Sequence, residues 1–180
     1  MLMRRDESVL LIIDIQERLV PAVENGNGVI AQTKKLIHAA QHLHIPVLAS
    51  EQYRKGLGDM VSELRTLLPS GACFDKTTFS CFAQAGVPER FAALQRRQIV
   101  ITGMEAHVCV LQSAIDFLQA NYQVFVTADA VSSRVRSSYD FGLARLRNAK
   151  VQIVTAEMVL FEWLGAAGTT EFKELLPLIK

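Results

Sequence analysis

Residues 98–118 read QIVITGMEAHVCVLQSAIDFL and contain an apolar run, a turn and an amphipathic stretch, in that order. The run Gln98–Thr102 is rich in Ile and Val, which is typical of a strand buried on both faces. Gly103 permits a tight turn. From Val108 to Asn121 the apolar residues recur every three or four positions, as they do on one face of a helix. The stretch therefore predicts a buried strand that leads directly into a helix.

The same alternation of short apolar runs and helical stretches extends along the chain. Further strands are expected at Val9–Asp14, Pro46–Ser50, Gln123–Thr127 and Lys150–Thr155, with the short segment Cys73–Lys76 as a candidate sixth. Helices are expected from about Val29 to His44, from Pro88-Glu89 onward, over Val135–Asn148 and in the tail Thr170–Lys180. Strands that alternate with helices pair in parallel through right-handed crossovers. We therefore predict one α/β domain over residues 1–180, a three-layer α/β/α fold with an open, mostly parallel, Rossmann-like sheet of five or six strands.

The composition is that of a globular protein, with 50% hydrophobic and 21% charged residues in 180. A formal net charge of +1 gives no electrostatic argument for binding nucleic acid or an anionic membrane. No apolar run reaches the roughly 20 residues of a membrane helix. We expect neither a nucleic-acid nor a membrane partner.

The cysteines and the first residues bear on the cellular compartment. Cys73, Cys81 and Cys109 form no CxxC pair and are odd in number, which favours free thiols in a reducing compartment. Two arginines precede the first apolar run, as in a signal peptide, but Asp6 and Asp14 interrupt that pattern. We expect a cytoplasmic protein.

In open parallel sheets, ligands bind beyond the carboxyl ends of the strands. Polar groups occur at four such ends: Asp14, the segment Ser50–Tyr53, Lys76 and the turn from Thr102 to Cys109. Burying the Asp14 carboxylate without a partner would cost several kcal/mol, which suggests a functional role. The alternative roles for Asp14 are a helix cap or a structural ion pair. Lys76 could equally be a surface residue with an extended side chain.

Cys109 falls in the first turn of the helix predicted from Val108. There the helix dipole and free N–H groups would stabilise a thiolate and receive an oxyanion. The alternative is a small buried apolar residue, which is the usual environment of cysteine. His107 could be a base or an outward-facing turn residue. His38 and His42 have the spacing of a metal-ligand pair but no acidic third ligand nearby in sequence. We therefore interpret them as residues on a partly exposed face of a helix.

Three segments together resemble the isochorismatase-like cysteine hydrolase superfamily, which includes nicotinamidases and N-carbamoylsarcosine amidases. They are LLIIDIQERL, FDKTTFSCF and VITGMEAHVCVLQSAIDFL, and the segments SEQYRKGLG and TADAVSSR are also similar to that family. The resemblance extends from about Ser8 to Leu164. It implies a catalytic triad of Asp14, Lys76 and Cys109. It further implies a cis peptide bond between Met104 and Glu105, and an oxyanion hole formed by the backbone N–H groups of Glu105 and Cys109.

Two departures from the family pattern are informative. Metal-binding nicotinamidases carry an Asp-x-His cluster after the second strand, where this chain has Ser50, Glu51, Gln52 and Tyr53. We therefore expect no metal and no other cofactor, and we expect Glu51, Gln52 and Tyr53 to line the substrate pocket instead. Isochorismatases that cleave a vinyl ether lack the cysteine nucleophile, so Cys109 argues against that reaction.

The resemblance predicts a cysteine-dependent hydrolase that cleaves a small amide through a thioester. A vinyl-ether or other non-amide hydrolase on the same fold, and a non-catalytic thiol-bearing binding protein, are the alternatives. We expect Cys109 to be the most reactive thiol, with a pKa below the roughly 8.5 of a free cysteine. We also expect a homo-oligomer, because the hydrophobic fraction is high for a domain of this size and relatives commonly self-associate.

Overall fold

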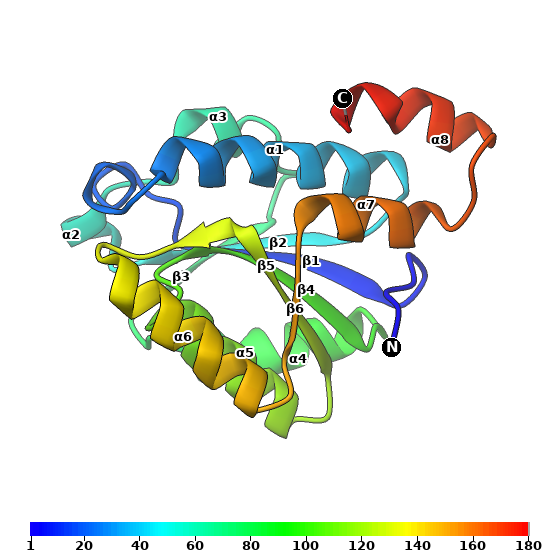
Figure 1. Ribbon diagram of the computed structural model, residues 1–180. Helices are drawn as coiled ribbons and strands as arrows, with labels where there is room; N and C mark the ends of the chain where they lie inside the picture. The colour runs from blue at the N-terminus through cyan, green and yellow to red at the C-terminus, as the bar shows by residue number, and fades with distance from the viewer. Residues whose placement is uncertain (180) are drawn as a thin grey trace.

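The computed structural model of the chain describes residues 1–179 and consists of a central sheet between two layers of helices (Figure 1). The strands are β1 (Ser8–Ile13), β2 (Val47–Gln52), β3 (Cys73–Lys76), β4 (Gln98–Met104), β5 (Gln123–Ser132) and β6 (Gln152–Val154). The helices are α1 (Gly26–His42), α2 (Arg54–Leu57), α3 (Ser62–Arg65), α4 (Val87–Ala93), α5 (Cys109–Gln119), α6 (Arg136–Asn148), α7 (Ala156–Leu164) and α8 (Thr170–Leu175), with 3-10 turns at Val20–Ala22 and Leu176–Leu178.

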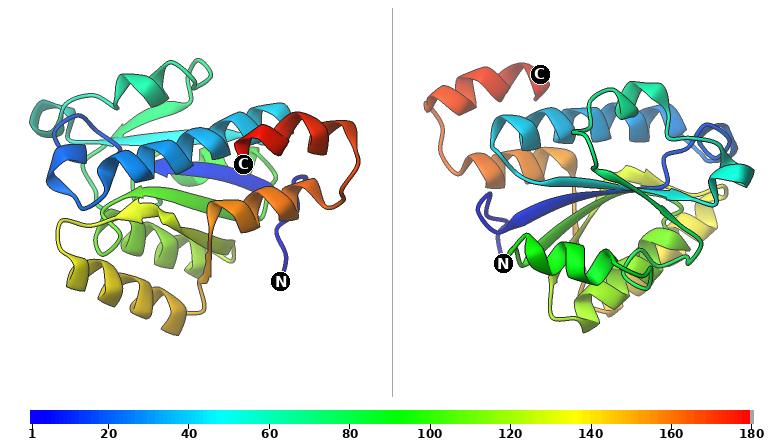
Figure 2. Two further views of the ribbon diagram at one scale, coloured as in Figure 1. Left: turned by 45° about the horizontal axis from the view of Figure 1, so that its top comes forward. Right: turned by 180° about the vertical axis from the view of Figure 1, so that it is seen from behind.

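The six strands lie in the order β3-β2-β1-β4-β5-β6, and every pair is parallel. Helices α1, α3 and α7 cover one face, and α4, α5 and α6 cover the other (Figures 1 and 2). The predicted α/β/α architecture is confirmed, and Cys73–Lys76 is the sixth strand, at one edge of the sheet. Chain order reverses direction beside β1, which has β2 on one side and β4 on the other. Ligand sites of open α/β sheets form beyond the carboxyl ends of strands at such a position.

Strand β1 is buried along its whole length because both faces of the sheet are covered. Leu10 and Ile12 pack under α1, whereas Val9, Leu11 and Ile13 pack on the opposite side. Because side chains of both faces are covered, the strand is apolar at every position from Val9 to Ile13. It delivers the next residue, Asp14, to the carboxyl edge of the sheet.

Several elements differ from the sequence prediction. Strand β4 continues through Gly103 to Met104 rather than ending at Thr102, and the short helices α2 and α3 were not predicted. Strand β2 continues to Gln52 rather than ending at Ser50, and β5 continues to Ser132 through an irregularity opposite Ile101–Gly103. Helix α7 was not predicted; the Thr155 hydroxyl caps its start and Gly165, with φ of 70°, ends it. In the predicted closing segment, α8 and a 3-10 turn are present, and Lys180 lies outside the described residues. No helix within residues 1–179 has both the length and the apolar character to cross a bilayer.

Candidate active site

Asp14 and Lys76 form an ion pair inside the protein. Asp14 follows β1 directly and has a left-handed backbone, with φ of 53°, while Lys76 is the last residue of β3. Lys76 Nζ donates to Asp14 Oδ2 at 2.8 Å, and neither side chain has any exposed area. Removing two charges from water costs several kcal/mol per ion, which the pair's attraction only partly offsets. A buried pair of this kind is therefore a candidate for a functional rather than a purely stabilising role.

The Lys76 ammonium is surrounded by acceptors. Besides Asp14 it donates to Gln52 Oε1 at 2.5 Å and approaches the carbonyl oxygens of Thr78 at 3.3 Å and Phe79 at 3.2 Å. Burial lowers the pKa of Lys76, but the Asp14 carboxylate and the nearby thiols raise it more, so the net shift is upward. Lys76 is therefore a fixed positive charge at neutral pH.

Cys109 is the first residue of α5, at the end of a turn that begins with a cis peptide bond between Met104 and Glu105. The Glu105 carboxylate anchors this turn by accepting from the backbone N–H of Arg134 at 2.9 Å and from its guanidinium at 3.1 Å. Gly142 of α6 lies against the turn, where an added Cβ would come within 3.1 Å of the Ala106 oxygen.

Two backbone donors of this turn are unused. Ala106 N–H bonds Ser132 O, and Val108 and Val110 N–H both bond Glu105 O. Within residues 1–179, neither the Glu105 N–H nor the Cys109 N–H has an acceptor in the protein. The turn can thus offer two free N–H groups to an anion.

The pKa of Cys109 is raised, not lowered as expected from its position on the helix. Burial is the largest cause, and the Asp14 carboxylate raises the pKa further. Lys76 lowers it, but by less. The resting thiol is therefore protonated at neutral pH, beside a carboxylate that can accept its proton.

Cys81 also belongs to this site, although the sequence analysis gave it no role. It is completely buried, and its Sγ lies 3.4 Å from Ser50 Oγ, which in turn lies 2.7 Å from Asp14 Oδ1. Burial and the Asp14 carboxylate raise the pKa of Cys81 to about 11. Cys73 is half-buried on the edge strand, and burial raises its pKa as well.

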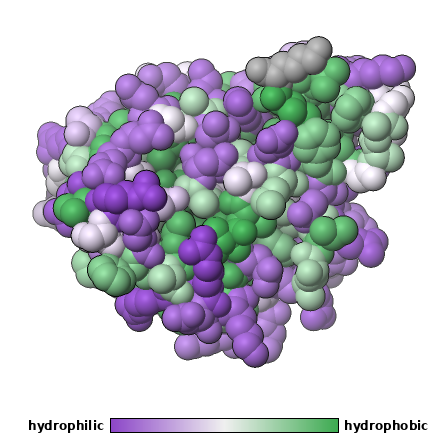
Figure 3. Space-filling model, viewed as in Figure 1, coloured by the Kyte–Doolittle hydropathy of each residue, from purple (hydrophilic) through white to green (hydrophobic). Residues whose placement is uncertain are grey.

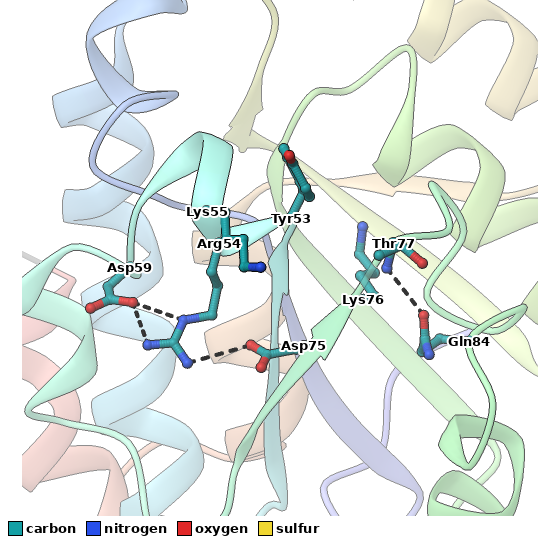
Figure 4. Close-up of a pocket in the computed structure, with 8 residues that line it drawn as sticks. All are labelled: Tyr53, Arg54, Lys55, Asp59, Asp75, Lys76, Thr77 and Gln84. Atoms are coloured by element: carbon teal, nitrogen blue, oxygen red, sulfur yellow. Dashed lines mark hydrogen bonds and ion pairs between the residues drawn. The ribbon is translucent and has the colours of Figure 1, made fainter.

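A cavity of about 730 Å³ opens beside Lys76, at the carboxyl ends of β2 and β3 (Figure 4). Its lining comprises Tyr53, Arg54, Lys55, Asp59, Asp75, Lys76, Thr77 and Gln84. Arg54 is held by ion pairs to Asp59 and Asp75. Cys109 is not part of this lining, so the cavity borders the site on its Lys76 side only, and we locate the reacting centre from the Asp14, Lys76 and Cys109 geometry.

Of the three residues expected to line the pocket, only Tyr53 does. Glu51 points to the opposite face of the sheet, where its carboxylate accepts from Met60 N–H at 2.7 Å and from Arg65 at 2.6 Å. Glu51 is not among the residues that line the cavity, although its Oε2 lies 3.7 Å from the guanidinium of the lining residue Arg54, and its expected contact with substrate stays a prediction. Gln52 is on the site face, but its amide is occupied by Lys76 and by Thr77 O.

Two of the histidines have partners outside the Asp14–Lys76 pair. His107 Nδ1 is 2.9 Å from Ser133 Oγ, and His42 pairs with Glu174 at 2.8 Å on the far side of α1. Among residues 1–179, no three His, Cys, Asp or Glu side chains gather at metal-binding distance.

Comparison with known proteins gives consistent matches. Residues 8–158 match the Isochorismatase domain family. Isochorismatase domain-containing protein 1 of Danio rerio is 38% identical over 177 residues, which cover 96% of this chain and 61% of that protein. Isochorismatase family protein 1B of Dictyostelium discoideum is 34% identical, with coverage of 97% and 87%. This chain thus spans about three fifths of the length of the Danio relative.

A solved structure from Caenorhabditis elegans, described as a ribonuclease, superimposes with a TM-score of 0.92 at 33% identity. The superposition covers 99% of this chain and 92% of that one. The arrangement of strands and helices is therefore shared along the whole described chain.

Proposed function

The chain belongs to the isochorismatase family, and we propose that it is a cysteine-dependent hydrolase that cleaves a small amide through a thioester on Cys109. The observation that carries this proposal is the buried Asp14–Lys76 pair next to the Cys109 thiol at the start of α5. A base, a fixed cation and a nucleophile in one site are the groups that acyl transfer requires.

In the first half-reaction, Asp14 takes the thiol proton as the sulfur attacks the amide carbon. Attack forms the S–C bond and moves the carbonyl electrons onto oxygen. The free N–H groups of Glu105 and Cys109 are suited to bind that oxyanion. Asp14 then returns the proton to the amide nitrogen, the C–N bond breaks, and ammonia or a small amine leaves.

In the second half-reaction, water attacks the thioester carbon and Asp14 accepts a proton from it. The S–C bond breaks, the acid product leaves, and the proton returns to sulfur. Lys76 stays charged throughout, because its four acceptors stabilise the ammonium, and it orients Asp14 through both transfers. The scheme needs no cofactor.

The substrate is expected to be a small molecule that enters from the cavity beside Lys76. Tyr53 offers an aromatic face there, and Gln84 and Thr77 offer polar groups. These residues could bind the remainder of the substrate while the amide lies between Lys76 and Cys109.

The test is ammonia release from a panel of small amides, with intact-mass detection of a covalent adduct. We expect Cys109→Ala to lose both turnover and adduct, while Cys73→Ala, a thiol on the edge strand, keeps both. Turnover of a vinyl ether but of no amide would support the non-amide hydrolase instead. Turnover that survives Cys109→Ala would refute the proposal.

RNA cleavage is a second activity to test, because the Caenorhabditis elegans relative is described as a ribonuclease. Against it, the net charge is only +1, and Arg54 in the cavity is already paired with Asp59 and Asp75. Incubation with labelled RNA distinguishes the two. Cleavage that is lost in both Cys109→Ala and Asp14→Asn would favour the ribonuclease.

A further inference from the structure

Ser50 contacts the Asp14 carboxylate from the strand next to β1. Its hydroxyl lies 2.7 Å from Asp14 Oδ1, and both residues have no exposed area. The backbones are tied as well, because Asp14 N–H donates to Ser50 O at 3.2 Å. We propose that Ser50 is a positioning residue, whose hydroxyl holds the Asp14 carboxylate in the orientation that serves Cys109. The inference rests on the proposed function and adds a residue to it.

Each oxygen of the Asp14 carboxylate accepts a hydrogen bond from a different side chain. Lys76 Nζ donates to Oδ2 and the Ser50 hydroxyl donates to Oδ1. The final torsion of an aspartate side chain is broad, so a carboxylate held on one oxygen alone could rotate. Two donors from different strands, β2 and β3, fix it.

The direction of the Ser50 hydrogen bond follows from its neighbours. Cys81 Sγ lies 3.4 Å from Ser50 Oγ, and burial keeps Cys81 as a thiol, which donates weakly. An ionised Asp14 can only accept. Ser50 therefore accepts from Cys81 and donates to Asp14, and its proton stabilises the carboxylate anion.

Loss of this hydroxyl has a distinct consequence for Cys109. Without this hydrogen bond the Asp14 carboxylate draws the Cys109 proton more strongly, so a larger share of the sulfur is in the reactive thiolate form. The titratable groups facing this pair are Lys76 from β3 and Cys81 from the loop before α4. Substitution at Ser50 leaves the Lys76–Asp14 contact in place but removes the hydroxyl that Cys81 contacts, so labelling of Cys81 is followed together with that of Cys109.

The experiment measures the rate of iodoacetamide labelling at Cys109 across neutral and alkaline pH, mapped by mass spectrometry. We expect Ser50→Ala to accelerate labelling at neutral pH by roughly tenfold, the equivalent of one hydrogen bond to a charged group. The matched control is Ser8→Ala, which removes a buried serine hydroxyl at the opposite end of β1, where it donates to Arg4 O.

A second pair of variants separates the hydroxyl from packing. Ser50→Thr keeps the hydroxyl and Ser50→Val replaces it with a methyl group of nearly equal size, so both share the same crowding. We expect the threonine variant to label like the wild type and the valine variant to label faster. This pair decides the question even if Ser50→Ala does not fold.

Two negative results have different meanings. If Asp14→Asn alters the Cys109 profile but the valine and threonine variants behave alike, the role of Ser50 is overturned and the triad stands. If Asp14→Asn also leaves the profile unchanged, the coupling between Asp14 and Cys109 is absent, and the proposed function is overturned together with this inference.

Discussion

The protonation state of Cys109 is set by three neighbours with opposing effects. Burial and the Asp14 carboxylate raise its pKa, and the Lys76 ammonium lowers it. The base and the nucleophile therefore share a proton that resides on sulfur in the resting protein. Cys73 is the more exposed thiol, so the structure favours Cys73 rather than Cys109 as the first to be alkylated at rest.

Removing either of the two charged partners of Cys109 is expected to change its labelling rate, in opposite directions for the two partners. Lys76→Met removes the cation that lowers the thiol pKa, so Cys109 labelling should slow, by about tenfold for each unit that the pKa rises. Asp14→Asn removes an anion that raises the pKa, so labelling should become faster at neutral pH while turnover is lost. The measurement is the site-mapped iodoacetamide rate against pH, with far-UV circular dichroism to verify folding.

The double variant Asp14→Asn/Lys76→Met is the control for an uncompensated buried charge. Its labelling rate should fall between those of the single variants. Single variants that both match the wild-type profile would contradict the proposed triad.

Chelation should leave activity intact. Glu51 is the best metal ligand among residues 50–53, but its carboxylate is bound to Met60 N–H and Arg65 on the other face of the sheet. His38 and His42 belong to α1 and do not reach the site. The check is dialysis against a strong chelator followed by the amide assay. Activity that is lost there and restored by zinc would contradict this interpretation.

Strand-end position singled out Asp14, Lys76 and the turn before Cys109 as candidates but left a structural role open for each; the resemblance to the family selected Asp14, Lys76 and Cys109 as a triad, which stays a prediction. Strand-end position was not sufficient for Glu51, whose direction depends on whether β2 continues past Ser50. The pKa of Cys109 was also unpredictable, since it depends on how deeply α5 and the preceding turn are buried.

Gly103 is the residue that lets β4 approach β1 at the site. Its φ is 123°, and an added Cβ would lie 1.9 Å from the Ile13 oxygen, so backbone would have to move. We expect Gly103→Ala to lower the free energy of unfolding by more than about 4 kcal/mol. Gly71→Ala is the matched control, because Gly71 also has a positive φ, of 75°, but nothing lies near its Cβ position.

For Gly71→Ala the expected loss is only about 1–2 kcal/mol, from the left-handed backbone alone. Urea unfolding monitored by circular dichroism gives both values. Equal losses in the two variants would show that close approach to Ile13 does not limit position 103.

At the level of elements, the strands were predictable, whereas the short helices α2 and α3 and the longer α7 were not. Each strand is a short Val- and Ile-rich run bounded by turns, which identifies it without tertiary information. The buried residues of α7, Ala156, Val159, Leu160 and Trp163, do follow the three- and four-residue spacing of an amphipathic helix. Because the exposed Met158 and Phe161 are apolar as well, the stretch from Met158 to Phe161 is continuously apolar and hides that spacing in the sequence. That helix is fixed by packing against α1 and β5, which a local pattern does not contain.

The surface of the whole molecule carries apolar side chains on both helical layers. Figure 3 shows hydrophilic residues over most of one face, with hydrophobic ones at its middle and near α8. At the start and on the outer side of α6, Val135 and Phe141 are exposed, Phe141 by 72%. Helix α6 also packs on the turn that precedes Cys109, through Gly142. Most of the other exposed residues of α6 are charged or polar, so Val135 and Phe141 form a small apolar spot next to the site, which could serve as a contact between two copies of the chain.

We therefore predict that the protein forms a symmetric homo-oligomer through α6, since a two-fold contact uses the same surface twice. Sedimentation velocity at micromolar concentration should give a species larger than the 20.0 kDa chain. Phe141→Asp should shift it toward the monomer, because a charge would be buried unpaired in the contact. Phe161→Asp, which places the same charge on α7 in the other layer, is the control and should leave assembly unchanged. A wild-type monomer would refute the oligomer. If Phe161→Asp dissociates the oligomer and Phe141→Asp does not, the contact lies on α7 rather than on α6.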